Sequence, residues 1–168
     1  MQLKEKEKKN VEVGSFLLKR LQTEASDQEV DKYKLHVEEV DKITSLILGL
    51  ASRLSRLDLS QIITKEGTEM VRGLAYNDNV HLNVHVQNSQ KSKKEKLLEQ
   101  MTEAKMLHKN IEKRGVAVGS LLRQYFTSAE YEQYTTFMKT KAMLILQNKV
   151  LSELQISTKN QIGTLSTL

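Results

Sequence analysis

The residues best placed for metal chemistry in this 168-residue chain are His81 and His85, in the stretch HLNVH. On a helix or on a strand, side chains four residues apart share one face, as two ligands of one metal ion must. Two histidines alone do not fill a tetrahedral zinc site, and the chain has no cysteine to complete one. We therefore expect no metal site and no cofactor. His36 and His108 fall at seam positions of helices, where a polar residue more often fixes register than binds a ligand.

Catalytic motifs are absent from the sequence. It contains no glycine loop that would cradle phosphates, no GxSxG and no HExxH. The lack of cysteine also removes thiol nucleophiles. The carboxylates fall at surface positions of heptads, where they are typical of a salt-bridging face. Because no acid, base and nucleophile converge, we expect a protein that is not an enzyme.

The charge balance is basic, with a net charge of +5. The densest basic run is KSKKEK at residues 91–96, and no aromatic residue interleaves it to stack on bases. Elsewhere lysine and glutamate are mixed, which predicts a solvated helix surface rather than a nucleic-acid partner. No apolar run approaches the ~18 residues that span a bilayer, so we expect no insertion into a membrane.

The composition predicts long helices. The chain has no proline and only 7 glycines, so little in it interrupts a helix. We expect an all-α fold in a single domain over residues 1–168, with helices at about 3–22, 28–66, 91–126 and 129–159. Ser26 with Glu29 matches a capping box at the start of the second helix, and Ser128 is a candidate N-cap for the last.

Two of these helices carry heptad seams, in which apolar residues alternate spacings of three and four. The seams are Tyr33, His36, Val40, Ile43, Ile47, Leu50, Leu54 and Leu57, and Met101, Ala104, His108, Ile111, Gly115, Val118, Leu122 and Tyr125. A helix over residues 28–62 would be about 50 Å long. Such a helix cannot bury its seam against itself, so the seam requires other helices.

The stretch DKITSLILGLASRLSRL holds more leucine than one seam needs. Leu46 and Leu48 lie off the seam, which makes the apolar stripe wide enough for two neighbours. Gly49 is small enough for another backbone to approach closely, and Arg53 and Arg56 leave the other side basic. The helix at 129–159 is likewise apolar on more than one face, which indicates two or more packing partners.

The helical pattern lapses over residues 67–90. Gly67, Gly73 and the run at residues 77–79 are turn signals. Val80, Leu82, Val84 and Val86 then alternate with polar residues, and a period of two predicts a strand. This segment is either an insertion that pairs with a copy of itself or a loop.

Two stretches resemble the C-terminal signature domain of the Shroom family of cytoskeletal proteins, the Apx/Shroom domain. One is DKYKLHVEEVDKITSLILGLASRLSRL at residues 31–57, and the other is KRGVAVGSLLRQYFTSAEYEQYTTFMKTKAMLILQNKVL at residues 113–151. The Asp41–Lys42 pair, the small residues within the leucines and FMKTKA at residues 137–142 are features that leucine periodicity does not produce. The sequence departs from the family pattern at Ser52, where the family has glycine, and in the length of residues 67–90.

The resemblance implies an elongated, segmented, antiparallel coiled-coil homodimer of long helices. In this hypothesis one apolar side builds the dimer through the seam residues Val40, Ile43, Ile47, Leu57, Ile111, Val118 and Leu122. The basic side beside it would bind the coiled coil of Rho-associated kinase. The residues carried over as kinase contacts are Leu50, Arg53, Leu54, Arg56, Lys139 and Lys141.

The resemblance also implies a cellular role. Such a domain recruits the kinase to apical actin in the cytoplasm, at cell junctions, and thereby promotes actomyosin contraction and a change of cell shape. Actin itself would be bound through other parts of the full-length protein. The alternative is a purely structural, self-assembling coiled coil that binds no kinase.

Overall fold

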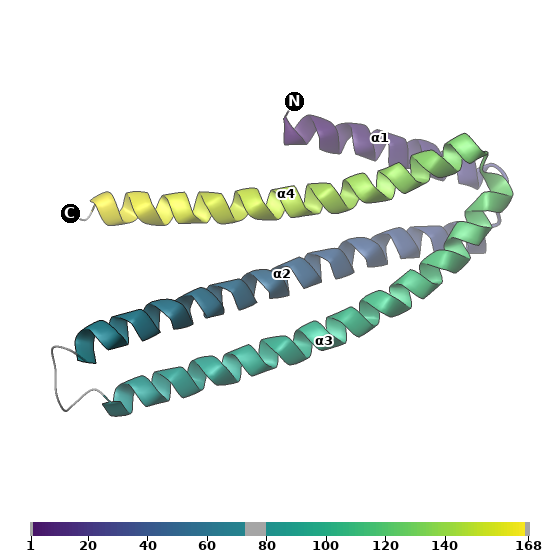
Figure 1. Ribbon diagram of the computed structural model, residues 1–168. Coiled ribbons are helices and arrows are strands. Elements are labelled where there is room, and N and C mark those ends of the chain that lie inside the picture. The colour runs from purple at the N-terminus through teal and green to yellow at the C-terminus, as the bar shows by residue number, and fades with distance from the viewer. Residues whose placement is uncertain (1, 73–79, 167–168) are drawn as a thin grey trace. The chain divides into compact units, whose positions relative to one another are not determined.

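The structure, a computed structural model, describes residues 2–72 and 80–166. Its elements are α1 (Leu3–Gln22), α2 (Asp27–Arg72), α3 (Val80–Tyr125) and α4 (Ser128–Ser166), shown in Figure 1. Within the described ranges every regular element is a helix, which confirms the predicted all-α class.

The helices build two compact units. The first unit contains Met1–Ser45 and His108–Leu168, and therefore holds α1, α4, the start of α2 and the end of α3. The second unit is Leu46–Leu107, which holds the remainder of α2 and of α3.

The core of the first unit draws on all four helices. Its fully buried members are Leu17 and Leu21 of α1 and Leu122 of α3. Val30, Tyr33, Val118, Phe126, Tyr134 and Phe137 complete the cluster. Burial of each large apolar side chain contributes about 1.5–3 kcal/mol, so this cluster is the main source of the unit's stability.

Polar contacts fix the helix directions within the first unit. Glu29 and Glu39 of α2 contact Tyr125 and Arg114 of α3, so these two helices run antiparallel. The rings of Tyr33 and Tyr134 lie 5.9 Å apart between centroids, and Asp41 contacts Lys141 further along, so α2 and α4 run parallel.

Capping boxes start α2 and α4. The amide of Glu29 donates to Ser26 Oγ at 3.3 Å, and the amide of Ser26 donates to Glu29 Oε1 at 3.1 Å, as predicted. At α4 the reciprocal pair is Thr127 with Glu130, at 3.2 and 2.9 Å. The N-cap of α4 is therefore Thr127 and not Ser128. Only Thr127 stands three residues before a glutamate, the spacing that a capping box requires.

The second unit is an antiparallel pair of helices. Leu50 of α2 and Ala104 of α3 are both buried. Asp58 and Lys94 form an ion pair at 2.7 Å further along the two helices.

The expected strand at residues 80–86 is wrong, because α3 begins at Val80. Val80 with Val84, and Leu82 with Val86, are also i,i+4 pairs, so this alternation is compatible with a helix. A strand of this length would also need a partner strand, which a chain of long helices does not supply. Likewise α2 continues past Gly67 to Arg72, so the expected loop at 67–90 is too long. The turn signals at Gly73 and residues 77–79 lie outside the described residues.

Candidate protein-interaction surface

The heptad seams are covered by helices of the same chain. In the first unit Ile43, Ile111, Val118 and Leu122 are between 0 and 7% exposed, and Val40 is half-buried. In the second unit Ile47, Leu54 and Leu57 are half-buried. The other helices that the seam requires are therefore supplied within one chain, a solution that the sequence alone did not distinguish from a pairing of two copies.

The basic side of α2 is open in the second unit. Arg53 and Arg56 are both exposed, and Arg56 Nη2 donates to Ser52 Oγ at 3.0 Å. Leu46, 47% exposed, lies on the same side of the helix, since about 100° of rotation per residue brings positions 46, 49, 53 and 56 together. A Cβ added at Gly49 would meet no atom within 4 Å. We call Leu46, Gly49, Arg53 and Arg56 the α2 basic face.

Leu50 does not belong to this face. Its side chain is only 3% exposed within the second unit, so it packs in the interior rather than facing a partner. Of the candidate contacts on α2, Arg53 and Arg56 are thus exposed, and Leu54 is half-buried.

The two lysines of FMKTKA have different environments in the first unit. Lys139 is exposed. Lys141 Nζ instead lies 2.7 Å from Asp41 Oδ2 and 5.2 Å from the centre of the Phe137 ring. Asp41 of the Asp-Lys pair and Lys141 of FMKTKA, two motifs a hundred residues apart, therefore meet in one ion pair. That pair connects α2 to α4 and gives Lys141 a structural role.

A groove of about 370 Å³ lies beside this ion pair, between α1, α2 and α4. Gly14, Leu18, Val37 and Phe137 are among its apolar lining residues. A Cβ at Gly14 would lie 2.7 Å from Phe137 Cε2, so α1 can approach α4 at this point only without a side chain. The sequence offered no signal for this groove beyond the glycine itself, because its walls come from three separate helices.

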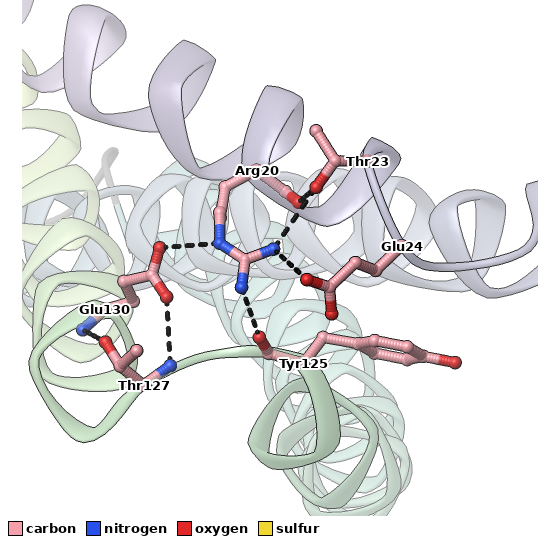
Figure 2. A network of polar contacts seen from close by, with 6 residues as sticks. All are labelled: Arg20, Thr23, Glu24, Tyr125, Thr127 and Glu130. Atoms are coloured by element: carbon pink, nitrogen blue, oxygen red, sulfur yellow. Dashed lines mark hydrogen bonds and ion pairs between the residues drawn. The ribbon is translucent and has the colours of Figure 1, made fainter.

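Arg20 connects the end of α1 to the connection between α3 and α4 (Figure 2). Its Nε lies 3.0 Å from Glu130 Oε2, and its Nη2 donates to the backbone oxygen of Tyr125 at 2.9 Å. Its Nη1 lies 3.3 Å from Glu24 Oε1 and donates to Thr23 Oγ1 at 3.2 Å. The network joins two helix connections, the one between α1 and α2 and the one between α3 and α4.

Several titratable groups around these connections are perturbed. The Thr127 amide, and then the Arg20 charge, lower the pKa of Glu130. The hydrogen bonds from the Ser26 amide and the Tyr125 hydroxyl lower the pKa of Glu29. Burial raises the pKa of Tyr134 to about 12 and also raises the pKa of Tyr33. These shifts follow from helix capping, from the Arg20 charge, from the Tyr125 hydrogen bond and from burial.

No set of three metal-ligating side chains gathers among the residues that the structure describes. None of the described helices has a stretch long and apolar enough to cross a membrane. Among the described residues, the α2 basic face combines an exposed apolar side chain with two exposed arginines.

Comparisons with known proteins found a matching family model and several relatives. The family model described as Apx/Shroom domain ASD2 matches residues 1–167. Protein Shroom of Drosophila melanogaster is 30% identical over 157 residues, which are 94% of this chain and 9% of that protein. Protein Shroom3 of Xenopus laevis is 26% identical over 146 residues, which are 87% of this chain and 7% of that protein. Protein Shroom4 of Homo sapiens is 26% identical over 146 residues, which are 86% and 9% of the two chains. The chain thus spans less than a tenth of the length of these relatives.

Proposed function

This chain belongs to the Apx/Shroom domain ASD2 family, and we propose on that premise that it is a cytoskeletal adaptor domain for Rho-associated kinase. The domain binds the coiled coil of the kinase and performs no reaction itself. Binding places the kinase on apical actin at cell junctions, where actomyosin contraction then changes cell shape. Contacts with actin belong to other parts of the full-length protein, and the adaptor acts as a homodimer.

The α2 basic face is the observation that supports this proposal. Arg53 and Arg56 are accessible, and their guanidinium groups suit the carboxylates that line the flanks of a coiled coil. Leu46 adds an exposed apolar contact, and the open space at Gly49 lets a partner helix approach closely. A charge pair that a partner desolvates contributes more than an exposed pair does, so we expect both arginines to contribute to binding.

Side-chain exposure ranks the candidate contact residues within the proposal. Arg53, Arg56 and Lys139 remain as candidate kinase contacts because their side chains are exposed. Leu50 and Lys141 would affect kinase binding indirectly, through packing and through the ion pair with Asp41.

A titration with the purified coiled coil of the kinase tests the proposal. The parent domain should bind, and Arg53→Glu/Arg56→Glu should bind at least about tenfold more weakly, since two attractions become repulsions. Lys93→Glu/Lys96→Glu is the matched control, because it makes the same change of charge at exposed positions of the second unit. The control should bind as the parent does. Equal binding by all three folded proteins would contradict the role of the α2 basic face.

A purely structural coiled coil is the second candidate function. The observation that favours it is the exposed apolar surface of α4, which suits contact between copies. A structural domain would tolerate charge reversal on α2, because exposed charges contribute only about 0–1 kcal/mol to stability. Absence of kinase binding by a folded parent would make this second candidate the better account.

A further inference from the structure

Gly49 leaves a gap among the side chains of the α2 basic face. Leu46 lies one turn before it and Arg53 one turn after it, on the same side of the helix. Leu46 is 47% exposed and Arg53 is exposed, so both side chains stand out from the second unit. Between them, a Cβ added at Gly49 would meet no neighbouring side chain or helix within 4 Å. We call this low point of the surface, between Leu46 and Arg53, the Gly49 notch.

Packing inside the chain does not account for glycine at the notch. At Gly14 and Gly115 a Cβ would lie 2.7 Å from Phe137 and 3.0 Å from His36, so a neighbouring side chain explains each of these glycines. Glycine in a helix interior lowers stability relative to alanine, and at Gly49 no such neighbour offsets this cost. The described contacts of the second unit thus give no reason for glycine there, whereas a contact with a partner would.

We propose that the Gly49 notch receives one large apolar side chain, such as leucine or phenylalanine, from the helical partner of the proposed function. When two helices pack, a side chain of one inserts between four residues of the other, and a glycine among the four leaves room for a large side chain. Leu46 and the aliphatic stem of Arg53 would contact the inserted side chain from either side. This inference rests on the proposed function and adds the residue type that the partner presents.

Charge indicates the kind of helix that carries this side chain. Arg53 and Arg56 come four and seven residues after Gly49, which is about 6 and 10 Å along the helix axis. A carboxylate of the partner can pair with each guanidinium group. The partner helix should therefore have two acidic residues about four and seven positions from its large apolar residue, on the same side.

The same charges disfavour a second copy of this chain at the notch. The chain has a net charge of +5. A two-fold contact through the α2 basic face would also bring the arginines of one copy against those of the other. An acidic helix gains attraction at the place where a second copy meets repulsion, so the occupant is a helix of another protein.

Binding of the purified coiled coil of Rho-associated kinase to variants of the whole chain tests the inference. Gly49→Leu fills the notch from within this chain and should weaken binding about tenfold or more, because overpacking replaces a fit. Ser55→Leu is the matched control, since Ser55 is an exposed residue of α2 on the opposite side from Leu46 and Arg53. The control should bind as the parent does.

Stability distinguishes the notch from an internal packing site. Leucine is a better helix former than glycine, so Gly49→Leu should keep the helix content of the parent and should not melt at a lower temperature. The predicted combination is weaker binding with equal or higher stability, which partial unfolding cannot produce. A melting temperature clearly below that of the parent would mean that the chain itself packs against the notch, and would overturn the inference.

A compensating change in the partner gives a second readout. The large apolar residues of the kinase coiled coil are replaced by alanine one at a time, and each variant is titrated with Gly49→Leu. One of them should recover most of the lost binding, because its smaller side chain leaves room for the added leucine. The residue identified in this way should have carboxylates about four and seven positions away. Recovery by none of the variants would contradict the proposed fit.

The outcomes separate this inference from the proposed function. If Arg53→Glu/Arg56→Glu loses binding while Gly49→Leu binds as the parent does, no partner side chain occupies the notch. The inference is then wrong and the proposed function stands. If a folded parent does not bind the coiled coil at all, the proposed function is wrong, and the inference that rests on it is wrong as well.

Discussion

At the scale of single residues, two glycines within helices have opposite surroundings. A Cβ at Gly14 would lie 2.7 Å from Phe137 Cε2 and 2.8 Å from Cζ, whereas a Cβ at Gly49 would meet nothing within 4 Å. Phe137 is buried in the core of the first unit, so moving its ring would disturb that packing. Packing against Phe137 therefore favours glycine at position 14. At position 49 the surroundings leave room for a side chain.

Gly14→Ala should destabilise the chain by about 1–3 kcal/mol, because overpacking outweighs the better helix propensity of alanine. Gly49→Ala, its control, should stabilise the chain by roughly 0.5–1 kcal/mol, since only the propensity changes. Chemical denaturation followed by circular dichroism measures both. A stabilising Gly14→Ala would show that α1 does not lie against Phe137.

His36 makes stability depend on pH. Its imidazole is buried in the first unit, where a Cβ at Gly115 of α3 would lie only 3.0 Å from His36 Cε1. Burial lowers the pKa of His36; Glu39 of α2 opposes this shift and Arg114 of α3 adds to it. In the unfolded chain the histidine takes up a proton near its usual pKa of about 6.5. The unfolded state therefore binds more protons below that pH, and the free energy of unfolding should fall as pH falls from about 7 to 5.

Denaturation midpoints of the parent and of His36→Gln across this range check the prediction. The variant should lose much of the slope between pH 7 and 5, because its side chain does not titrate. Carboxylates with lowered pKa values, such as Glu29 and Glu130, lose their stabilising effect only at lower pH. An unchanged slope in the variant would assign the pH dependence to other groups.

At the scale of elements, Arg20 holds the end of α1 to the connection between α3 and α4 through Glu130 and the Tyr125 carbonyl. Arg20→Met keeps most of the aliphatic stem and removes these contacts, leaving the carbonyl and the carboxylate without that partner. We expect the melting temperature to fall by several degrees. Lys19→Met, at an exposed neighbouring position, is the control and should have little effect. Equal melting temperatures for the two variants would mean that the network in Figure 2 does not stabilise the unit.

Much of the element structure was predictable from local patterns. The seam from Tyr33 to Leu57 and the Ser26–Glu29 capping box located α2, because helical periodicity and capping act over a few residues. The strand predicted at residues 80–86 was wrong because the run is short. Its alternation also contains i,i+4 pairs, which fit a helix equally well. Local sequence patterns could not predict the groove at Gly14 or the Asp41–Lys141 ion pair, because both depend on helices far apart in sequence.

At the scale of the whole molecule, the candidate site was only partly predictable. Arg53 and Arg56 were named from the leucine-arginine run and are exposed. Leu50 and Lys141 were named beside them, and the structure places one in the interior and the other in an ion pair. Whether a side chain is buried depends on which helix packs against its side of α2. The α2 seam has apolar residues on both sides, so the sequence does not specify which helix packs where. α4 illustrates the same ambiguity, because Leu144 is buried whereas the equally apolar Leu146 and Val150 are exposed.

The domain's central property, in our account, is that a helical partner docks on the α2 basic face. Amide hydrogen exchange of the whole chain, with and without the purified coiled coil of Rho-associated kinase, tests this most directly. We predict that the partner slows exchange over residues 46–56 of α2, where Leu46, Gly49, Arg53 and Arg56 would be covered. Residues 150–160 of α4 should change no more than self-association alone changes them. Binding of the kinase without added protection over residues 46–56 would contradict the account.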